Sequence, residues 1–176
     1  TTEQLKINDS LVSVRGQGCL NTRPSPFGIA HGIVYGDGSN QNYPSPVSLS
    51  LFGSKGNELI KFFSASHMTK IETPNKVLGV RVSDLPRSFK LLPDWGESKS
   101  FLYGWLAGYF AADGHISEKG QASIASASLD NIKFVRNLCA KLAIPTNNIV
   151  TQLRKGYGVE EAPLYRIGLE INCLSE

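Results

Sequence analysis

Two aspartates are the residues of this 176-residue chain best placed for chemistry. Asp37 and Asp113 stand 76 positions apart, and each follows a stretch with a small residue at every fourth position and precedes a glycine. On a helix, this spacing makes a smooth face along which another backbone can come close. If the two faces pack together, the carboxylates meet beside unsatisfied helix-end carbonyls and repel each other unless cations lie between them. The pattern therefore predicts a divalent metal site.

The small residues define a helix interface. The glycines expected there are Gly28, Gly32, Gly104 and Gly108. A single Asp-Gly pair is most often a turn or a helix end. Two pairs at the same offset from a small-residue face make that interpretation the weaker one.

The segment LAGYFAADG, residues 106–114, resembles the motif that names the LAGLIDADG homing endonucleases. Residues 30–38 resemble a diverged first copy. Two copies in one chain are typical of the monomeric form of this family, in which one polypeptide supplies both halves of a pseudo-twofold molecule. The resemblance covers roughly residues 26–172. It implies an α+β fold with two pseudo-symmetric αββαββ halves, whose helices pack on antiparallel sheets that form a DNA-binding saddle.

The resemblance also implies an activity, the site-specific cutting of both strands of a long DNA target. Asp37 and Asp113 would be catalytic and would hold Mg²⁺ together with the main-chain carbonyls of Gly36 and Ala112. Ca²⁺ would be a non-catalytic substitute. Magnesium needs few protein ligands, and it can neutralise a phosphate, activate water and stabilise a leaving oxygen. Family members leave short 3′ overhangs.

Recognition would fall to the strands, because a twisted antiparallel ribbon can enter the major groove. The candidates are polar residues expected to face outward: Arg81, Arg154, Arg166, Lys155, Lys70, Lys76 and Ser48. For each of them, a solvated surface charge is an equally good interpretation. Lys55 and Lys70 are also candidates for organising water near the metal, a role that family members give to Lys or Gln. His31 is predicted to lie on the helix surface.

The repeat predicts four regions: an N-terminal arm over residues 1–25, a first half over 26–83, a linker over 84–99 and a second half over 100–176. The arm resembles the edge of an intein splicing domain. In the first half, apolar periodicity predicts strands over 47–51 and 76–83 and a short helix over 57–64. In the second, it predicts a strand over 121–128, a helix over 129–142 capped by Ser128, and a hairpin over 148–172. Family members carry a third helix after the last strand, so the second half is expected to be truncated.

Composition adds little to the functional prediction. A net charge of +3 and a pI of about 8.8 are compatible with nucleic-acid binding but do not prove it. Three cysteines without Cys-x-x-Cys spacing favour neither a disulfide framework nor zinc. No signal sequence or long apolar run is present. We therefore expect a monomer that acts on double-stranded DNA inside the cell, in the cytoplasm or nucleoid, without a membrane partner.

Two alternatives remain open at this point. The same fold could bind DNA or RNA without cutting it, as a maturase or a regulator. The chain could also be an intein remnant that supports a splicing domain structurally. Metal-dependent nicking separates the first alternative from the nuclease, and loss of splicing on deletion identifies the second.

Overall fold

The computed structural model describes residues 22–39, 46–63, 66–155 and 161–170. The predicted N-terminal arm therefore lies almost wholly outside the described part of the chain, as do residues 156–160 and 171–172 of the predicted hairpin. Within these ranges, the chain forms helices and antiparallel strands. The predicted α+β fold class is confirmed.

In the described residues, the two halves follow a similar order of elements, except that the second has an additional short strand, β4, after its first helix. The first half comprises α1 (Pro26–Asp37), β1 (Val47–Phe52), α2 (Gly53–Leu59), the 3₁₀ helix η2 (Ile60–Phe63), β2 (His67–Glu72) and β3 (Leu78–Leu85). The second comprises α3 (Lys99–Asp113), β4 (Gly114–Ile116), β5 (Ala122–Ser126), α4 (Leu129–Lys141), β6 (Val150–Lys155) and β7 (Glu161–Leu169). A second 3₁₀ helix, η3 (Arg87–Lys90), follows β3.

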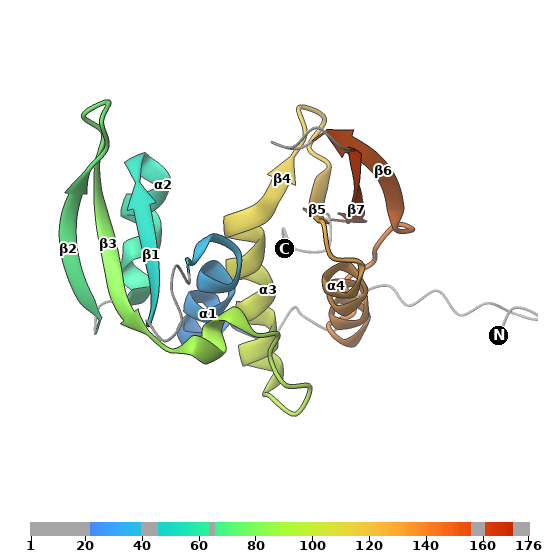
Figure 1. Cartoon of the computed structure of the whole chain (residues 1–176). Helices are drawn as coiled ribbons and strands as arrows, with labels where there is room; N and C mark the ends of the chain where they lie inside the picture. Colours follow the sequence, from blue (N-terminus) through green and yellow to red (C-terminus); the bar gives the residue numbers. More distant parts are fainter. Residues whose placement is uncertain (1–21, 40–45, 64–65, 156–160, 171–176) are drawn as a thin grey trace, which may run out of the picture.

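The two sheets flank a central helix pair, α1 and α3 (Figure 1). The first sheet has the order β1-β3-β2 and the second β4-β5-β7-β6, with antiparallel pairing throughout. In the first half, an isolated bridge between Ser39 and Ser48 occupies the position that corresponds to the β4–β5 pairing of the second half. Thus β1 corresponds to β5, β3 to β7 and β2 to β6.

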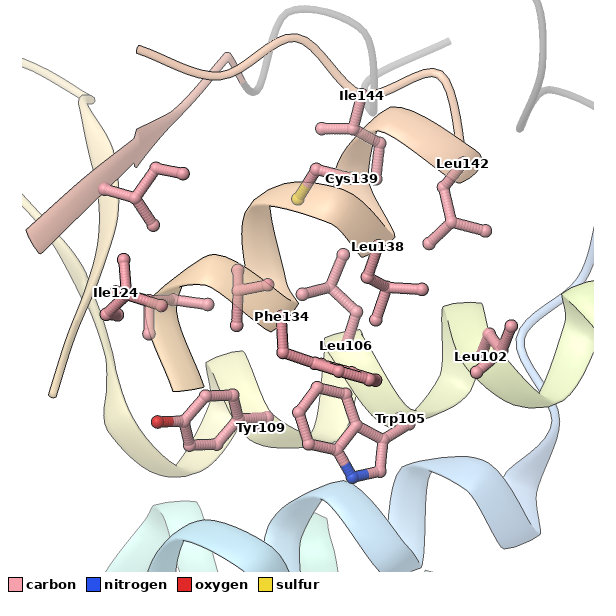
Figure 2. Close-up of a cluster of buried hydrophobic side chains, with 13 residues drawn as sticks. Leu102, Trp105, Leu106, Tyr109, Ile124, Phe134, Leu138, Cys139, Leu142 and Ile144 are labelled. Carbon is pink, nitrogen blue, oxygen red and sulfur yellow. The ribbon is translucent and has the colours of Figure 1, made fainter. Parts of the chain in front are cut away.

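Each half has its own apolar core. The buried residues of the first cluster lie between Ala30 and Phe89 in sequence, and those of the second between Leu102 and Ile167. Figure 2 shows the second cluster, in which Trp105 packs with Phe134 at the contact of α3 and α4. Burial of one such side chain contributes about 1.5–3 kcal/mol, so each cluster helps to hold the helix of its half on the adjacent sheet.

Helices α1 and α3 touch through their backbones. A Cβ built at Gly32 would overlap the carbonyl oxygen of Trp105, and one built at Gly108 would lie 2.9 Å from the backbone nitrogen of Ile33. Gly28 and Gly104 are equally close to the opposite backbone. All four glycines named from the sequence therefore lie on this helix seam, and side chains larger than hydrogen do not fit there.

We expect Gly108→Ala to destabilise the protein by about 1–3 kcal/mol, because the added methyl group forces the two backbones apart. At an open helix position the same change would instead stabilise by up to about 1 kcal/mol. Urea unfolding followed by circular dichroism measures the difference. Asn137→Ala, on the exposed side of α4, is the control and should shift stability by less than about 0.5 kcal/mol. Unchanged stability of Gly108→Ala would contradict the close seam.

A buried histidine fixes the segment between the halves. His31 is 6% exposed, and its ring stacks on Phe89 of η3 with the centroids 4.8 Å apart. Its Nε2 donates a hydrogen bond to the carbonyl oxygen of Leu91 at 2.9 Å. The prediction that His31 lies on the helix surface is therefore wrong, because a segment 60 residues later in the chain folds back over it.

The stability of the protein should fall as the pH drops below about 6.5. Burial lowers the pKa of His31, partly offset by its bond to the Leu91 carbonyl. The unfolded chain therefore takes up a proton at a higher pH than the folded protein does, and this favours unfolding as the solution is acidified. Thermal unfolding between pH 7.5 and 5.5 measures the effect.

Two variants isolate the histidine. His31→Gln should be less stable than the wild type at pH 7.5 and should lose less further stability on acidification. His115→Gln, at an exposed position, should keep the wild-type pH dependence. If His31→Gln and the wild type lose stability in parallel, the buried ring is not the source.

Several predicted elements match and one was missed. The strands at β1 and β5 and the helix α4 are confirmed, and Ser128 caps α4 by accepting a hydrogen bond from the Asn131 nitrogen at 3.3 Å. The first short helix begins at Gly53, earlier than predicted. The sequence did not indicate β2, an edge strand with five of its six residues exposed. No helix in the described ranges is long and apolar enough to cross a membrane.

Candidate functional site

The two aspartates end the central helices in contact with one another's last turn. Helix α1 ends at Asp37 and α3 at Asp113. A Cβ built at Gly36 would lie 2.5 Å from the Ala112 Cβ and 3.0 Å from Asp113 Oδ2. Because position 36 has no side chain, the two helix ends and both carboxylates share one small region. Helix-end carbonyls and carboxylates together make this region strongly negative.

Lys55 of α2 spans the two helix ends. Its Nζ donates to Asp37 Oδ2 at 3.4 Å and to the Ala112 carbonyl oxygen at 3.1 Å. The side chains of Lys55 and Asp37 are 55% and 37% exposed, so their ion pair contributes little to stability. The ammonium nevertheless lies between two of the oxygens named from the sequence as metal ligands.

A second lysine reaches the same end of α1 from η3. Lys90 Nζ donates to the carbonyl oxygens of Tyr35 at 2.5 Å and Val34 at 3.3 Å. A cation at a helix C-terminus interacts favourably with the helix dipole. Burial lowers the pKa of Lys90, and the nearby charges of Asp113 and Asp37 oppose that shift. The sequence analysis missed Lys90, which no local pattern connects with the helix end.

The environments of the two carboxylates differ. Burial, followed by the charge of Asp37, raises the pKa of Asp113, and Lys90 and Lys55 partly offset the increase. Beside Asp113 lies a cavity of about 280 Å³ that Tyr35 and Tyr109 also line. Burial raises the pKa of both phenols, so they are neutral hydroxyl groups at physiological pH. A cation near Asp113 would relieve the repulsion between the carboxylates.

The donor groups fit a hard cation such as Mg²⁺. Two carboxylates and the Ala112 carbonyl, which accepts from Lys55, are oxygen groups of the kind that Mg²⁺ prefers, with water completing its shell. Among the described residues, no three His, Cys, Asp or Glu side chains lie together in a way that could hold a metal ion, so an ion at the two aspartates would need carbonyl, water or phosphate oxygens to complete its shell. Asp37, Asp113 and the carbonyls of Gly36 and Ala112 would hold the ion.

Strand register separates the predicted recognition residues by sheet face. In the first sheet, Arg81 pairs with Ser50 and Thr69, and Ser48 shares their face, opposite the buried Leu49 and Val82. In the second sheet, Arg166 pairs with Val150, and Arg154 alternates onto that same face, opposite the buried Ile167. These four residues, Ser48, Arg81, Arg154 and Arg166, lie on the faces turned away from the helices.

The other three candidates are placed differently. Lys70 pairs with Val80 and Lys155 pairs with Glu161, which puts both lysines on the helix-side faces of edge strands. Lys76 lies in the turn between β2 and β3 with a positive φ of 60°. The expectation that Lys70 and Lys155 face outward with the arginines is therefore wrong, because each sits one residue out of phase with them.

A polar hollow of about 610 Å³ opens on the outer side of the second sheet. Arg166 lines it together with residues that the sequence analysis did not single out: His115, Gln121, Ser123 and Asn148. The alternation of Gln121 and Ser123 with the buried Ala122 and Ile124 was the available signal. This alternating pattern covers few positions because β5 has only five residues.

Comparison with known proteins agrees with this geometry. The family model described as a LAGLIDADG-like domain matches residues 100–168, the half with the better preserved motif. Residues 100–168 thus form a LAGLIDADG-like domain. No protein in the curated collection matches the chain.

The solved structures with the same fold include a homing endonuclease and DUF199/WhiA. The homing endonuclease I-DmoI, in complex with DNA and Ca, matches with a TM-score of 0.53 at 10% identity, covering 84% of this chain and 83% of that one. The N-terminal LAGLIDADG domain of DUF199/WhiA gives 0.51 at 13%, covering 89% and 87%. Full-length DUF199/WhiA from Thermatoga maritima gives a TM-score of 0.56 at 12% identity, and the match covers 92% of this chain but 57% of that one. At these identities the likeness shows the fold alone.

Proposed function

We propose that this chain, with its LAGLIDADG-like domain, is a site-specific DNA endonuclease that makes double-strand breaks by metal-dependent hydrolysis of phosphodiesters. The observation that carries the proposal is the meeting of Asp37 and Asp113 at the ends of two packed helices, between two sheets with outward arginines. Structures of I-DmoI with DNA contain Ca, Mn or Mg. The oxygen donors described above suit the same class of ion. We propose a monomer that acts on duplex DNA inside the cell.

Each group at the site has a distinct task in this proposal. The aspartates and the helix-end carbonyls bind the cation, which when bound supplies charge neutralisation at the phosphate and an activated water. Lys55 and Lys90 place ammonium groups beside the carboxylates, where they can stabilise the charge that develops on the phosphate oxygens. Arg81 and Arg166 orient one half of the target on each sheet.

A non-cleaving nucleic-acid binder is the second candidate, and the position of Lys55 favours it. Its ammonium already lies between Asp37 Oδ2 and the Ala112 carbonyl oxygen. A tethered cation there competes with a free metal ion for the same oxygens. In this case the helix pair and the sheets would hold DNA, and no strand would be cut.

Incubation of a randomised duplex library with the protein distinguishes the two candidates. The reaction is run with Mg²⁺ and, as a binding-only control, with Ca²⁺, and the DNA ends and the retained duplexes are sequenced. Discrete double-strand breaks at one motif with 3′ overhangs, seen only with Mg²⁺, support the nuclease. Specific retention without breaks in either metal supports the binder, and no retention contradicts both.

Asp113→Asn should abolish cleavage of the selected duplex while leaving its binding nearly unchanged, because the substitution removes the charge and keeps the shape. Gel assays of cleavage and fluorescence anisotropy of binding measure the two effects. Asp130→Asn, at an exposed position in the first turn of α4, is the matched control and should cut normally. Full activity of Asp113→Asn would refute the two-aspartate mechanism.

Arg166→Ala should weaken binding of the selected duplex roughly tenfold or more, because an arginine contact with a base edge is worth about 1–3 kcal/mol. Lys155→Ala also removes one positive charge from the second sheet, but from its opposite face. It should change the Kd less than threefold. Anisotropy titrations in Ca²⁺ at fixed salt measure both. Equal losses in the two variants would mean that binding depends on net charge and not on the sheet face.

A further inference from the structure

Arg81 and Arg166 occupy equivalent positions on the outer faces of the two sheets. Each directly precedes a buried residue on the middle strand of its ladder, Val82 in β3 and Ile167 in β7. Val82 pairs with β1, and Ile167 pairs with β5, the corresponding strand of the second half. Because the registers correspond, the residues beside the two arginines can be compared row by row.

The row next to Arg81 is apolar. Ile71, Gly79 and Phe52 stand opposite one another across β2, β3 and β1. A Cβ built at Gly79 would overlap the ring of Phe52, so the ring covers the place where a side chain of β3 would otherwise lie. Phe52 is nevertheless 38% exposed. An aromatic side chain thus lies on the outer face within reach of a bound molecule.

Val77 continues the apolar surface into the turn between β2 and β3. The backbone nitrogen of Thr73 donates to the Val77 carbonyl oxygen at 3.0 Å, which extends the ladder one pair beyond the last pair of the two strands. Val77 therefore shares the outer face with Arg81, and it is 45% exposed. We call Phe52, Ile71 and Val77 the outer apolar patch.

The equivalent rows of the second sheet carry polar groups on the outer strand. Gln152 of β6 stands where Ile71 stands in the first sheet, and it pairs with Leu164. One row further, Arg154 pairs with Ala162. All six residues of β6 are exposed. The two outer faces therefore share an arginine and differ in the chemistry beside it.

Positive charge flanks the outer apolar patch. Arg81 lies one row away from Phe52 and Ile71, and Lys76 lies in the adjoining turn. A surface with cationic side chains favours a polyanion such as the phosphate backbone of DNA. The patch is continuous with the face that carries Arg81, so a duplex bound by that arginine would also lie against the patch.

Each kind of side chain favours a particular base edge in the major groove. Arginine pairs with guanine, glutamine pairs with adenine, and apolar groups contact the methyl group of thymine. Outward residues two apart on a strand are separated by about 6.8 Å, or about two base steps of 3.4 Å. Neighbouring rows of a sheet can therefore contact different base pairs.

We propose that the two halves of the DNA target share a guanine and differ next to it. The first sheet recognises thymine methyl groups through its outer apolar patch, and the second recognises purines through Gln152 and Arg154. The half of the target on the first sheet is therefore rich in thymine. This inference rests on the proposed binding of duplex DNA, but it does not require that the protein cut the DNA.

Replacement of thymine by uracil tests the proposal, because it removes only the methyl group and keeps the hydrogen-bonding edge. Two randomised duplex libraries, one with thymine and one with uracil in its place, are incubated with the full chain in Ca²⁺, and the retained duplexes are sequenced. The thymine library should yield a motif with a guanine in each half and thymines in one half. The uracil library should keep the guanines and lose the preference at the thymine positions.

Titrations of the selected duplex measure the effect of single methyl groups. Uracil in the thymine-rich half should raise the Kd about fourfold for each methyl group removed. Uracil in the other half should change the Kd less than twofold. Fluorescence anisotropy in Ca²⁺ at fixed salt measures both values.

Matched variants assign the effect to the outer apolar patch. Phe52→Ala should bind the thymine and uracil duplexes with nearly equal Kd. Leu78→Ala should keep the difference, because Leu78 is 72% exposed but lies on the opposite face of the same sheet. Val77→Ser, in the turn, should also reduce the difference. Each variant is its own reference for the ratio, so a loss of folding, checked by circular dichroism, is not mistaken for a loss of recognition.

The outcomes separate this inference from the proposed nuclease activity. The same motif in both libraries overturns the inference, even if the protein cuts that motif in Mg²⁺. Retention that depends on the methyl groups, without breaks in Mg²⁺, supports the inference and contradicts the nuclease. An equal loss of the thymine–uracil difference in Phe52→Ala and Leu78→Ala, or no retained duplex at all, also overturns the inference.

Discussion

The direct contact of the α1 and α3 backbones is the constraint on which the rest of the molecule depends. It brings two helix ends together. The two carboxylates and the helix-end carbonyl oxygens at these ends repel one another electrostatically. This repulsion is offset because each half contributes an apolar core that holds its helix in place. The electrostatic repulsion between the two carboxylates is thus opposed by apolar packing in each half.

Two lysines place positive charge beside this negative region. Lys90 bonds to the end of α1 from the segment between the halves, and Lys55 bridges Asp37 and the Ala112 carbonyl. Both lysines come from the first half or from the segment that follows it. The two halves therefore have similar backbones but contribute different charges to the site, where burial and the charge of Asp37 raise the pKa of Asp113.

The sequence predicted those features that local pattern determines. The small-residue spacing located both central helices, and the apolar stripe of α4 and its cap at Ser128 followed from period and residue type. Features set by distant contacts were not predictable: His31 is buried by Phe89, and Lys90 reaches a helix end 55 residues earlier. The edge strand β2 is exposed on both faces, so its sequence does not alternate between apolar and polar residues and gave no strand signal. Lys70 and Lys155 were misplaced because a shift of one residue reverses the face of a strand.

The separation of the two cores also has a consequence for synthesis on the ribosome. The buried residues of the first cluster are all present once the chain has emerged to Phe89, so the first half can close before most of the second exists. The glycine face of α1 then remains bare until α3 has been made. The nascent protein thus passes through a stage in which a narrow, side-chain-free strip of helix is exposed to solvent. Newly made chains in a polysome hold such strips close together, and prompt emergence of each chain's own α3 limits the time available for pairing with a neighbour.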